Sequence, residues 1–125
     1  MSAPTTYQVH ATARPGREAA VTAGSTTVAI DAAWDEPPSG SPGPAELLAG
    51  AFAACLLKNL ARCRGLIGFD YEDAEVTVTA RRQDAPPRFV EISYALRVRT
   101  AEPARRLDLA HQRSEEHTSE LQSRF

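Results

Sequence analysis

Cys55 is the residue of this chain with the widest range of possible chemistry. A cysteine thiolate is a nucleophile, and a peroxide oxidises it to a sulfenic acid where a cation or a helix N-terminus stabilises its charge. Cys55 follows Pro44 by eleven residues in an apolar stretch, so an activating charge has to come from elsewhere in the fold, and Arg is the natural candidate. The competing interpretation is an inert thiol in a helix core, which is the commoner fate of such a cysteine.

Cys63 is the second of the two cysteines, and it is not predicted to pair with Cys55. Eight residues of one helix would separate their Cα atoms by about 12 Å along the axis, whereas a disulfide needs them within roughly 7 Å. Cys63 would also lie about 80° around the helix from Cys55. We therefore expect two thiols, with Cys63 an inert residue near the helix end rather than a resolving thiol.

Other kinds of site have little support in the sequence. His10 and His111 have no Cys or acidic residue at metal-ligand spacing, so no zinc site is predicted. The sequence contains no phosphate-binding glycine pattern and no nucleophile elbow. We therefore expect neither a metal nor a cofactor.

Composition and charge limit the expected partners. The chain has 14 basic and 16 acidic side chains, a formal net charge of −2, and no basic face that would suggest nucleic acid. Its longest apolar run, Leu47–Leu57, is shorter than the roughly 18 residues that span a bilayer. No charged-then-apolar signal segment follows Met1. The prediction is a soluble, cytoplasmic protein that binds neither nucleic acid nor membrane.

The last residues have an unusual match. Residues 113–123 correspond, position for position, to an in-frame translation of a common sequencing-library adapter. We therefore expect one domain over residues 1–112, incomplete at its C-terminus, and an adapter-derived artefact tail over residues 113–125, which is left out of the fold prediction. A natural polar helical tail is the alternative. Under the artefact interpretation, any second functional cysteine of the natural C-terminus is missing.

Three short strands and a loop are predicted before the apolar stretch. Short runs of β-branched, aromatic and small apolar residues between turn signals indicate the strands, which are Thr5–Ala13, Ala19–Ala23 and Thr26–Ala32. The first strand is expected to bury one face, made of Tyr7, Val9 and Ala11. Gly24-Ser25 is a plausible hairpin turn, so this third of the chain is predicted to be a small antiparallel meander. The Pro- and Gly-rich segment Trp34–Gly43 is predicted to be a surface loop.

A long apolar helix is predicted over Pro44–Arg64. Pro44 suits the first helical position, Glu46 in the first turn favours the helix dipole, and Gly65 is expected to end the helix. The helix is apolar nearly all round, so other structure or a partner subunit has to enclose it. Small residues from Ala49 to Ala54 would permit close helix packing. We therefore expect a homodimer in which this helix packs against its symmetry mate.

A β-hairpin and a second helix are predicted after the long helix. Apolar and polar residues alternate in Ala74–Arg81 and again in Phe89–Arg99, which indicates two long antiparallel strands. The inward positions of the second strand are expected to be Val90, Ile92, Tyr94, Leu96 and Val98. An amphipathic helix that carries Leu107 and Ala110 begins after Glu102-Pro103. The fold class is therefore α+β.

The run Pro44-Ala-Glu-Leu-Leu-Ala-Gly-Ala-Phe-Ala-Ala-Cys55, between a β-meander with a Gly/Pro loop and a long β-hairpin, resembles the OsmC/Ohr family. The resemblance covers most of residues 7–112. It implies an intertwined α+β homodimer and, from its better-studied members, a thiol peroxidase that reduces organic hydroperoxides in oxidative stress defence. In those members the helix cysteine forms a sulfenic acid and then a disulfide with a C-terminal cysteine. A lipoylated protein or another dithiol reduces that disulfide.

The resemblance also implies roles for particular residues. Cys55 would be the peroxidatic thiol. Arg17, in Pro-Gly-Arg-Glu, resembles the turn Arg that holds the thiolate and polarises the peroxide, and its alternative is a solvated turn cation. Arg14, three residues away, is an alternative cation with weaker support. The chemistry suits these residue types, because a guanidinium stabilises both the thiolate and the developing alkoxide.

The acidic residue departs from the family pattern. Peroxidase members place a Glu ten positions before the cysteine, where this chain has Ala45, while Glu46 is nine positions before it. A helix turns by about 900° over nine residues, so Glu46 and Cys55 would face opposite sides and lie roughly 13 Å apart. Glu46 could therefore assist only across the dimer or through Arg17. Its alternative is a first-turn charge that favours the helix dipole.

Three functions are consistent with these residues. The first is an OsmC-like thiol peroxidase that uses Cys55 with Arg17 and Glu46. The second is a non-catalytic OsmC-like dimer that binds a small hydrophobic ligand in its interface cleft, suggested by Ala45 at the position of the family acid. The third is a purely structural dimer core, in which Cys55 would resist thiol reagents until the protein unfolds.

Overall fold

The computed structural model describes residues 4–16, 18–34 and 37–122, with side chains described up to Glu115. Along the chain there are three short strands, a long helix, two long strands and a second helix, which confirms the predicted α+β class. The chain divides into two compact units, Met1–Leu47 and Leu48–Phe125.

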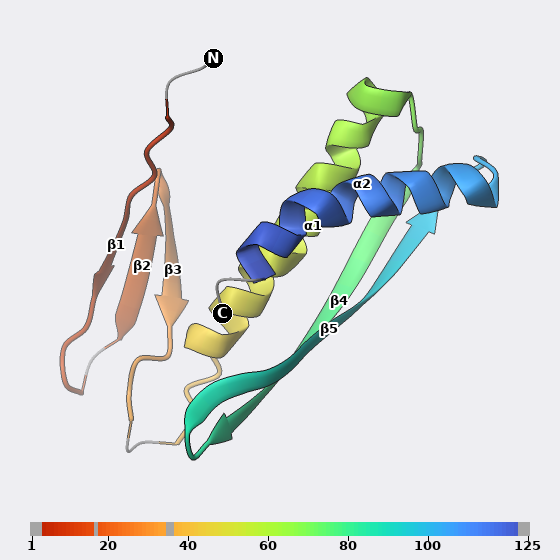
Figure 1. Ribbon diagram of the computed structural model, residues 1–125. Helices are drawn as coiled ribbons and strands as arrows, with labels where there is room; N and C mark the ends of the chain where they lie inside the picture. The colour runs from red at the N-terminus through yellow and green to blue at the C-terminus, as the bar shows by residue number, and fades with distance from the viewer. Residues whose placement is uncertain (1–3, 17, 35–36, 123–125) are drawn as a thin grey trace. The chain divides into compact units, whose positions relative to one another are not determined.

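The first unit is built on an antiparallel meander. Its strands are β1 (Val9–Thr12), β2 (Ala19–Ala23) and β3 (Thr26–Ile30), and they lie in that order in one sheet (Figure 1). Val9 lies opposite Ala23 across the first pair, and Ala19 lies opposite Ile30 across the second. Gly24 has a φ of +60° in the tight turn between β2 and β3, a conformation that favours glycine. The predicted meander and hairpin turn are therefore confirmed.

The prediction of a half-buried first strand is wrong for this chain by itself. β1 is shorter than predicted, and all four of its residues are exposed. Tyr7 precedes the strand and is 86% exposed, while Val9 is 69% exposed. The alternating pattern identified a strand, but the described part of this unit supplies no apolar layer that covers it. An alternating pattern marks a face that can be buried, and it does not say which surface covers that face.

Asp31 organises the loop between β3 and the long helix. Its carboxylate accepts hydrogen bonds from the backbone N–H groups of Ala33 and Ser39, both at 3.2 Å. Its own backbone N–H donates to the carbonyl of Pro42 at 2.9 Å. These bonds close the Pro-rich loop before the helix begins, which is the usual role of an aspartate beside a turn.

The long helix, α1, covers Pro44–Ile67 and begins at the predicted proline. The predicted end at Gly65 is wrong, because α1 continues through Gly65 and stops before Gly68, which has a φ of +65°. Ile67 packs against the buried core, and that burial outweighs the cost of about 1 kcal/mol for a glycine inside a helix. Gly68 then reverses the chain as a left-handed glycine.

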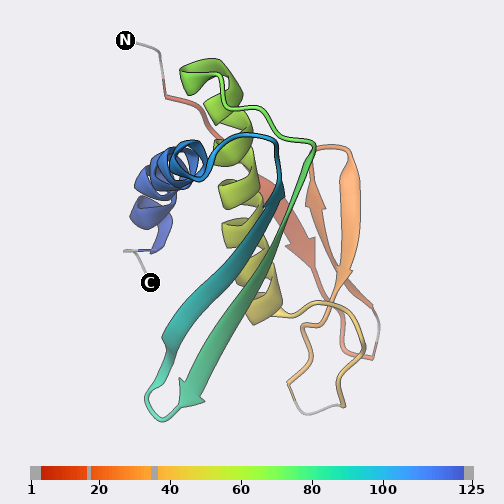
Figure 2. The same ribbon diagram turned by 90° about the vertical axis from the view of Figure 1, so that its right-hand side faces the viewer.

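In the second unit, β4 (Asp73–Asp84) and β5 (Pro87–Arg99) form a long antiparallel hairpin (Figure 2). The predicted alternation in β4 is confirmed, with the apolar residues half-buried and the polar ones exposed. Val90 was predicted to face inward, and that is wrong, because it is 45% exposed. Arg81 pairs with Glu91 whereas Arg82 pairs with Phe89, so β5 carries one extra residue there. This bulge turns Phe89 inward in place of Val90.

The second helix, α2 (Ala104–Gln122), crosses α1 in the second unit (Figures 1 and 2). It begins where predicted and runs beyond residue 112, after which the artefact tail was predicted to start. A buried cluster joins α1, the following loop and α2, and consists of Leu60, Cys63, Phe69 and Ala110. The guanidinium of Arg106 in α2 donates to the carbonyl of Ile67 at 2.6 Å, which satisfies one of the terminal carbonyls of α1.

Within one chain, α1 is covered along a single face. Its buried residues are Phe52, Leu56, Leu60 and Cys63, which recur at helical spacing. Leu47 and Leu66 are 37% and 51% exposed. By length and composition α1 is the one described helix that could cross a membrane, a weak indication because core helices of soluble proteins pass the same test. No continuous apolar run of that length occurs in the chain.

Candidate thiol site

Cys55 lies at the edge of the buried face of α1. It is half-buried, while Leu56 beside it is almost fully buried at 1% exposed. On a helical wheel Cys55 lies about 60° from Phe52, with Asn59 between them. Both cysteines of the chain are in the thiol form. Cys55 as a residue is therefore partly shielded from water.

Asn59 contacts the sulfur of Cys55. Its side-chain Nδ2 donates to Sγ of Cys55 at 3.5 Å, one helical turn away. The same nitrogen donates to the backbone carbonyl of Ser114 in α2 at 3.4 Å. Asn59 thus connects the thiol to the second helix, and these three groups all belong to the second unit.

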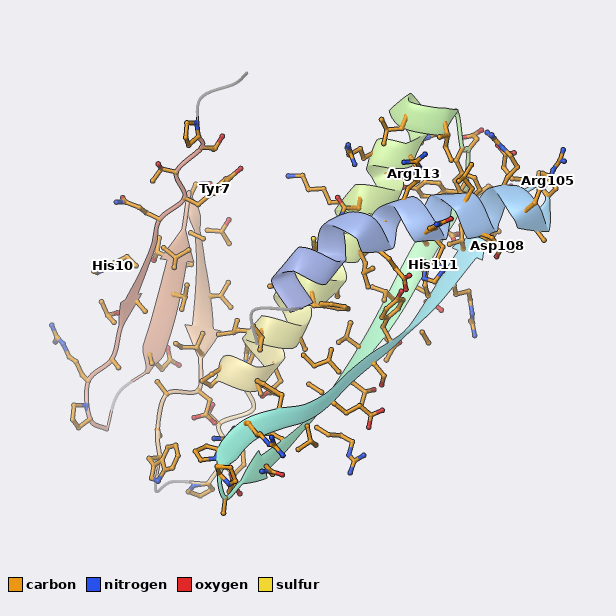
Figure 3. All side chains as sticks on the ribbon, in the orientation of Figure 1. Tyr7, His10, Arg105, Asp108, His111 and Arg113 are labelled. Carbon is orange, nitrogen blue, oxygen red and sulfur yellow. The ribbon has the colours of Figure 1, made fainter. Side chains whose placement is uncertain are left out.

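A second polar group lies next to Phe52. The ring of Tyr94 on β5 is tilted against Phe52 with 5.8 Å between centroids. Its hydroxyl is 2.7 Å from Nε2 of His111 and also donates to the carboxylate of Glu115. Figure 3 shows His111 pointing from α2 toward the hairpin. Burial raises the pKa of Tyr94, and the hydrogen bond and negative charge of Glu115 raise it further.

Cys63 has a different environment from Cys55. It is 1% exposed and belongs to the central cluster of the second unit. Its thiol donates to the carbonyl of Ala110 at 3.6 Å. An enclosed thiol with a neutral acceptor is typical of a packing residue, in keeping with the expectation that Cys63 is inert.

Of the three predicted site residues, the structure describes Cys55 and Glu46, and it does not bring these two together. Arg17 lies outside the described residues, so the predicted pairing of its guanidinium with Cys55 stays a prediction. Glu46 is exposed in the first turn of α1, and nine residues of that continuous helix amount to a rise of about 13 Å to Cys55. Arg14, the alternative cation, is exposed.

Sequence reasoning missed Asn59 and Tyr94. Asn59 follows Cys55 by four residues, and side chains at that spacing meet on a helix surface. A signal for this contact was therefore present in the sequence. Tyr94 was expected to face inward, but its contacts with Phe52 and His111 depend on how β5 and α2 pack. No local pattern could have indicated them.

Comparisons with known proteins agree with the fold. Residues 37–122 match the family model described as OsmC-like protein. No curated protein matches the chain.

Solved structures give the same result. An OsmC-like protein from Mycoplasma pneumoniae superposes with a TM-score of 0.81 at 14% identity, covering 95% of this chain and 86% of that one. The organic hydroperoxide resistance protein OhrB of Bacillus subtilis gives 0.61 at 19% identity, covering 95% and 90%. An organic hydroperoxide resistance protein OsmC from Legionella pneumophila gives 0.64 at 18%, covering 94% and 87%. At these identities the similarity establishes the fold.

Proposed function

We propose that this chain, which belongs to the OsmC-like protein family, reduces organic hydroperoxides with the thiol of Cys55. The observation that supports this proposal most is the environment of that sulfur, which is half-buried and faces an amide donor at 3.5 Å. Two similar structures are named for organic hydroperoxide resistance. A role in the response to oxidative stress follows from the proposal.

The reaction transfers one hydroxyl group to sulfur. The Cys55 thiolate attacks the terminal oxygen of the hydroperoxide, an S–O bond forms, and the O–O bond breaks. Sulfur loses two electrons and becomes a sulfenic acid, while the peroxide leaves as an alkoxide that takes up a proton to give the alcohol. A dithiol then returns two electrons, restores the thiol and releases water. A lipoylated protein or a small dithiol would serve as this reductant.

A cation has to stabilise both the thiolate and the departing alkoxide. We assign this role to Arg17, with Glu46 as an acid that acts through Arg17 or across a dimer. The assignment predicts that Arg17→Met slows peroxide reduction far more than Arg14→Met, which removes a neighbouring turn cation. Equal losses in the two variants would remove Arg17 from the mechanism.

A homodimer in the cytoplasm is part of the proposal. Exposed apolar side chains on both units, such as Tyr7, Val9 and Leu66, are 86%, 69% and 51% exposed in the single chain. A second copy could bury such side chains, because removal of apolar surface from water favours association. The expected oligomer is testable by sedimentation, where a monomer at micromolar concentration would contradict it.

Consumption of an organic hydroperoxide tests the function directly. The wild-type chain, Cys55→Ser and Cys63→Ser are each incubated with cumene hydroperoxide and dithiothreitol. We expect Cys55→Ser to lose peroxide consumption and Cys63→Ser to keep it. Serine at position 63 changes one atom and keeps a donor that faces the Ala110 carbonyl. Equal activity in all three proteins would refute the proposal.

The second candidate is a non-catalytic dimer that binds a small hydrophobic ligand. Ala45 favours it, because a half-buried methyl group occupies the position of the acid in peroxidase members. A hydrophobic compound would then raise the melting temperature equally in wild type and in Cys55→Ser. A shift that disappears with the sulfur would argue against this candidate.

A further inference from the structure

Asn59 and Cys55 form a side-chain pair on one face of α1. Residues four apart on a helix differ by about 40° in direction, so their side chains meet. Here Nδ2 of Asn59 donates to Sγ of Cys55 at 3.5 Å. The chain contains a single asparagine, and it occupies the position from which a short amide can reach this sulfur.

The Ser114 contact fixes the orientation of the Asn59 amide. A backbone carbonyl can only accept a hydrogen bond, so the NH₂ end of Asn59 has to face Ser114. That nitrogen carries two hydrogens, which suffices for the contacts with the carbonyl at 3.4 Å and with the sulfur at 3.5 Å. Because the acceptor is a main-chain carbonyl, any amino acid at position 114 of the chain would supply it where α2 is formed.

Burial strengthens this interaction. Both Cys55 and Asn59 are half-buried, and Leu56 and Leu60, on the neighbouring face of α1, are 1% and 0% exposed. A hydrogen bond to a charged group gains strength where water is partly excluded. A donor held in place before ionisation also needs no reorganisation when the negative charge develops.

We infer that Asn59 is a catalytic residue whose side-chain amide stabilises the thiolate of Cys55. The family resemblance assigns no role to this position. The inference rests on the proposed function in one respect, because the thiolate is taken to be the reactive species. The amide complements the guanidinium proposed for Arg17 and acts from within the same helix.

The test measures Cys55 reactivity without any peroxide. Iodoacetamide alkylates thiolates. The buried Cys63 is replaced by Ser in all samples, so that the alkylation rate reports on Cys55. Four proteins are compared: the Cys63→Ser protein, and the same protein that also carries Asn59→Leu, Asn59→Asp or Gln83→Leu. Gln83→Leu is the matched control, because it also removes an amide that donates to a backbone carbonyl, that of Pro86 at 3.1 Å. Circular dichroism checks that each protein is folded.

Asn59→Leu is expected to alkylate about tenfold more slowly at neutral pH and to require a higher pH for half-maximal rate, since it removes a charge-assisted hydrogen bond. Asn59→Asp keeps the size of the side chain and places a negative charge near the sulfur, so its rate should fall at least as far. Gln83→Leu should leave the rate within about twofold, because its amide lies in the hairpin.

Two results would overturn the inference. One is an unchanged rate and pH profile in a folded Asn59→Leu protein. The other is an equal loss of rate in Gln83→Leu, which would indicate a general effect of destabilisation. The outcome is separate from that of the proposed function: a chain that never consumes hydroperoxide can still show the alkylation change, and a peroxidase can lack it.

Discussion

Leu60 offers a quantitative test of how the second unit is held together. Its side chain is 0% exposed and belongs to the cluster with Cys63, Phe69 and Ala110. Leu60→Ala removes buried methyl groups and leaves a cavity between α1, the following loop and α2. Substitutions of this kind cost about 2–5 kcal/mol, and the surrounding elements limit how far the site can collapse. We expect a loss in the upper half of that range.

Leu66→Ala is the matched control on the same helix. Leu66 is 51% exposed, so the same truncation should cost less than about 1 kcal/mol. A difference of about 3 kcal/mol between the variants corresponds to roughly a hundredfold change in the unfolding equilibrium. It is also a large share of the roughly 5–15 kcal/mol that stabilises a typical domain.

Urea unfolding followed by circular dichroism measures both variants. The protein concentration is held constant, because self-association would add to the apparent stability. With a slope of about 1–3 kcal/mol per molar urea, Leu60→Ala should lower the midpoint by about 1–5 M or unfold the protein without denaturant. Equal midpoints for Leu60→Ala and Leu66→Ala would refute the placement of the core.

Two further predictions concern single residues. Gly65→Ala should stabilise the chain by about 0.5–1 kcal/mol, because position 65 lies inside the helix. Gly68→Ala should destabilise the chain by about 1 kcal/mol, because Gly68 has a φ of +65°. Thermal unfolding compares the two variants, and the opposite order of stability would restore Gly65 as the helix end. Burial and Glu115 raise the pKa of Tyr94 in the folded protein. The stability that the neutral hydroxyl contributes is therefore fully present below the unfolded-state pKa of about 10, and it is lost as the pH rises through the higher folded-state pKa. An absorbance titration should show one tyrosine that ionises last, and Tyr94→Phe should abolish that step; a last step that persists in Tyr94→Phe would contradict the assignment.

The regular elements could be predicted from local patterns, and the corrections have local physical causes. The alternation in residues 74–81 predicted β4 because every second side chain faces the same side of a strand. Val90 was misplaced because one extra residue in β5 switches the face on which neighbouring side chains lie, and an unbroken alternating pattern does not reveal a bulge. Gly65 was taken as a stop because glycine commonly follows the end of a helix. The burial of Ile67 carries the helix further, and that burial depends on residues distant in the sequence.

The candidate site was predictable only in part. Cys55 was found from its residue type and its helix, because a thiol carries its chemistry with it. Its partner Asn59 was within reach of a helical spacing argument, whereas the carbonyl of Ser114 comes from a segment 55 residues away. Arg17 lies outside the described residues, so its predicted role rests on the family resemblance. The prediction that residues 113–125 derive from an adapter likewise stays a prediction.

The central claim is that Cys55 reacts with a hydroperoxide and Cys63 does not. Mass spectrometry of the chain after one equivalent of cumene hydroperoxide, with the sulfenic acid trapped by dimedone, measures this without any reductant. We expect the adduct on the peptide that contains Cys55 and none on Cys63 while the protein is folded. A folded protein with no adduct on Cys55, or with equal adducts on both cysteines, would contradict it.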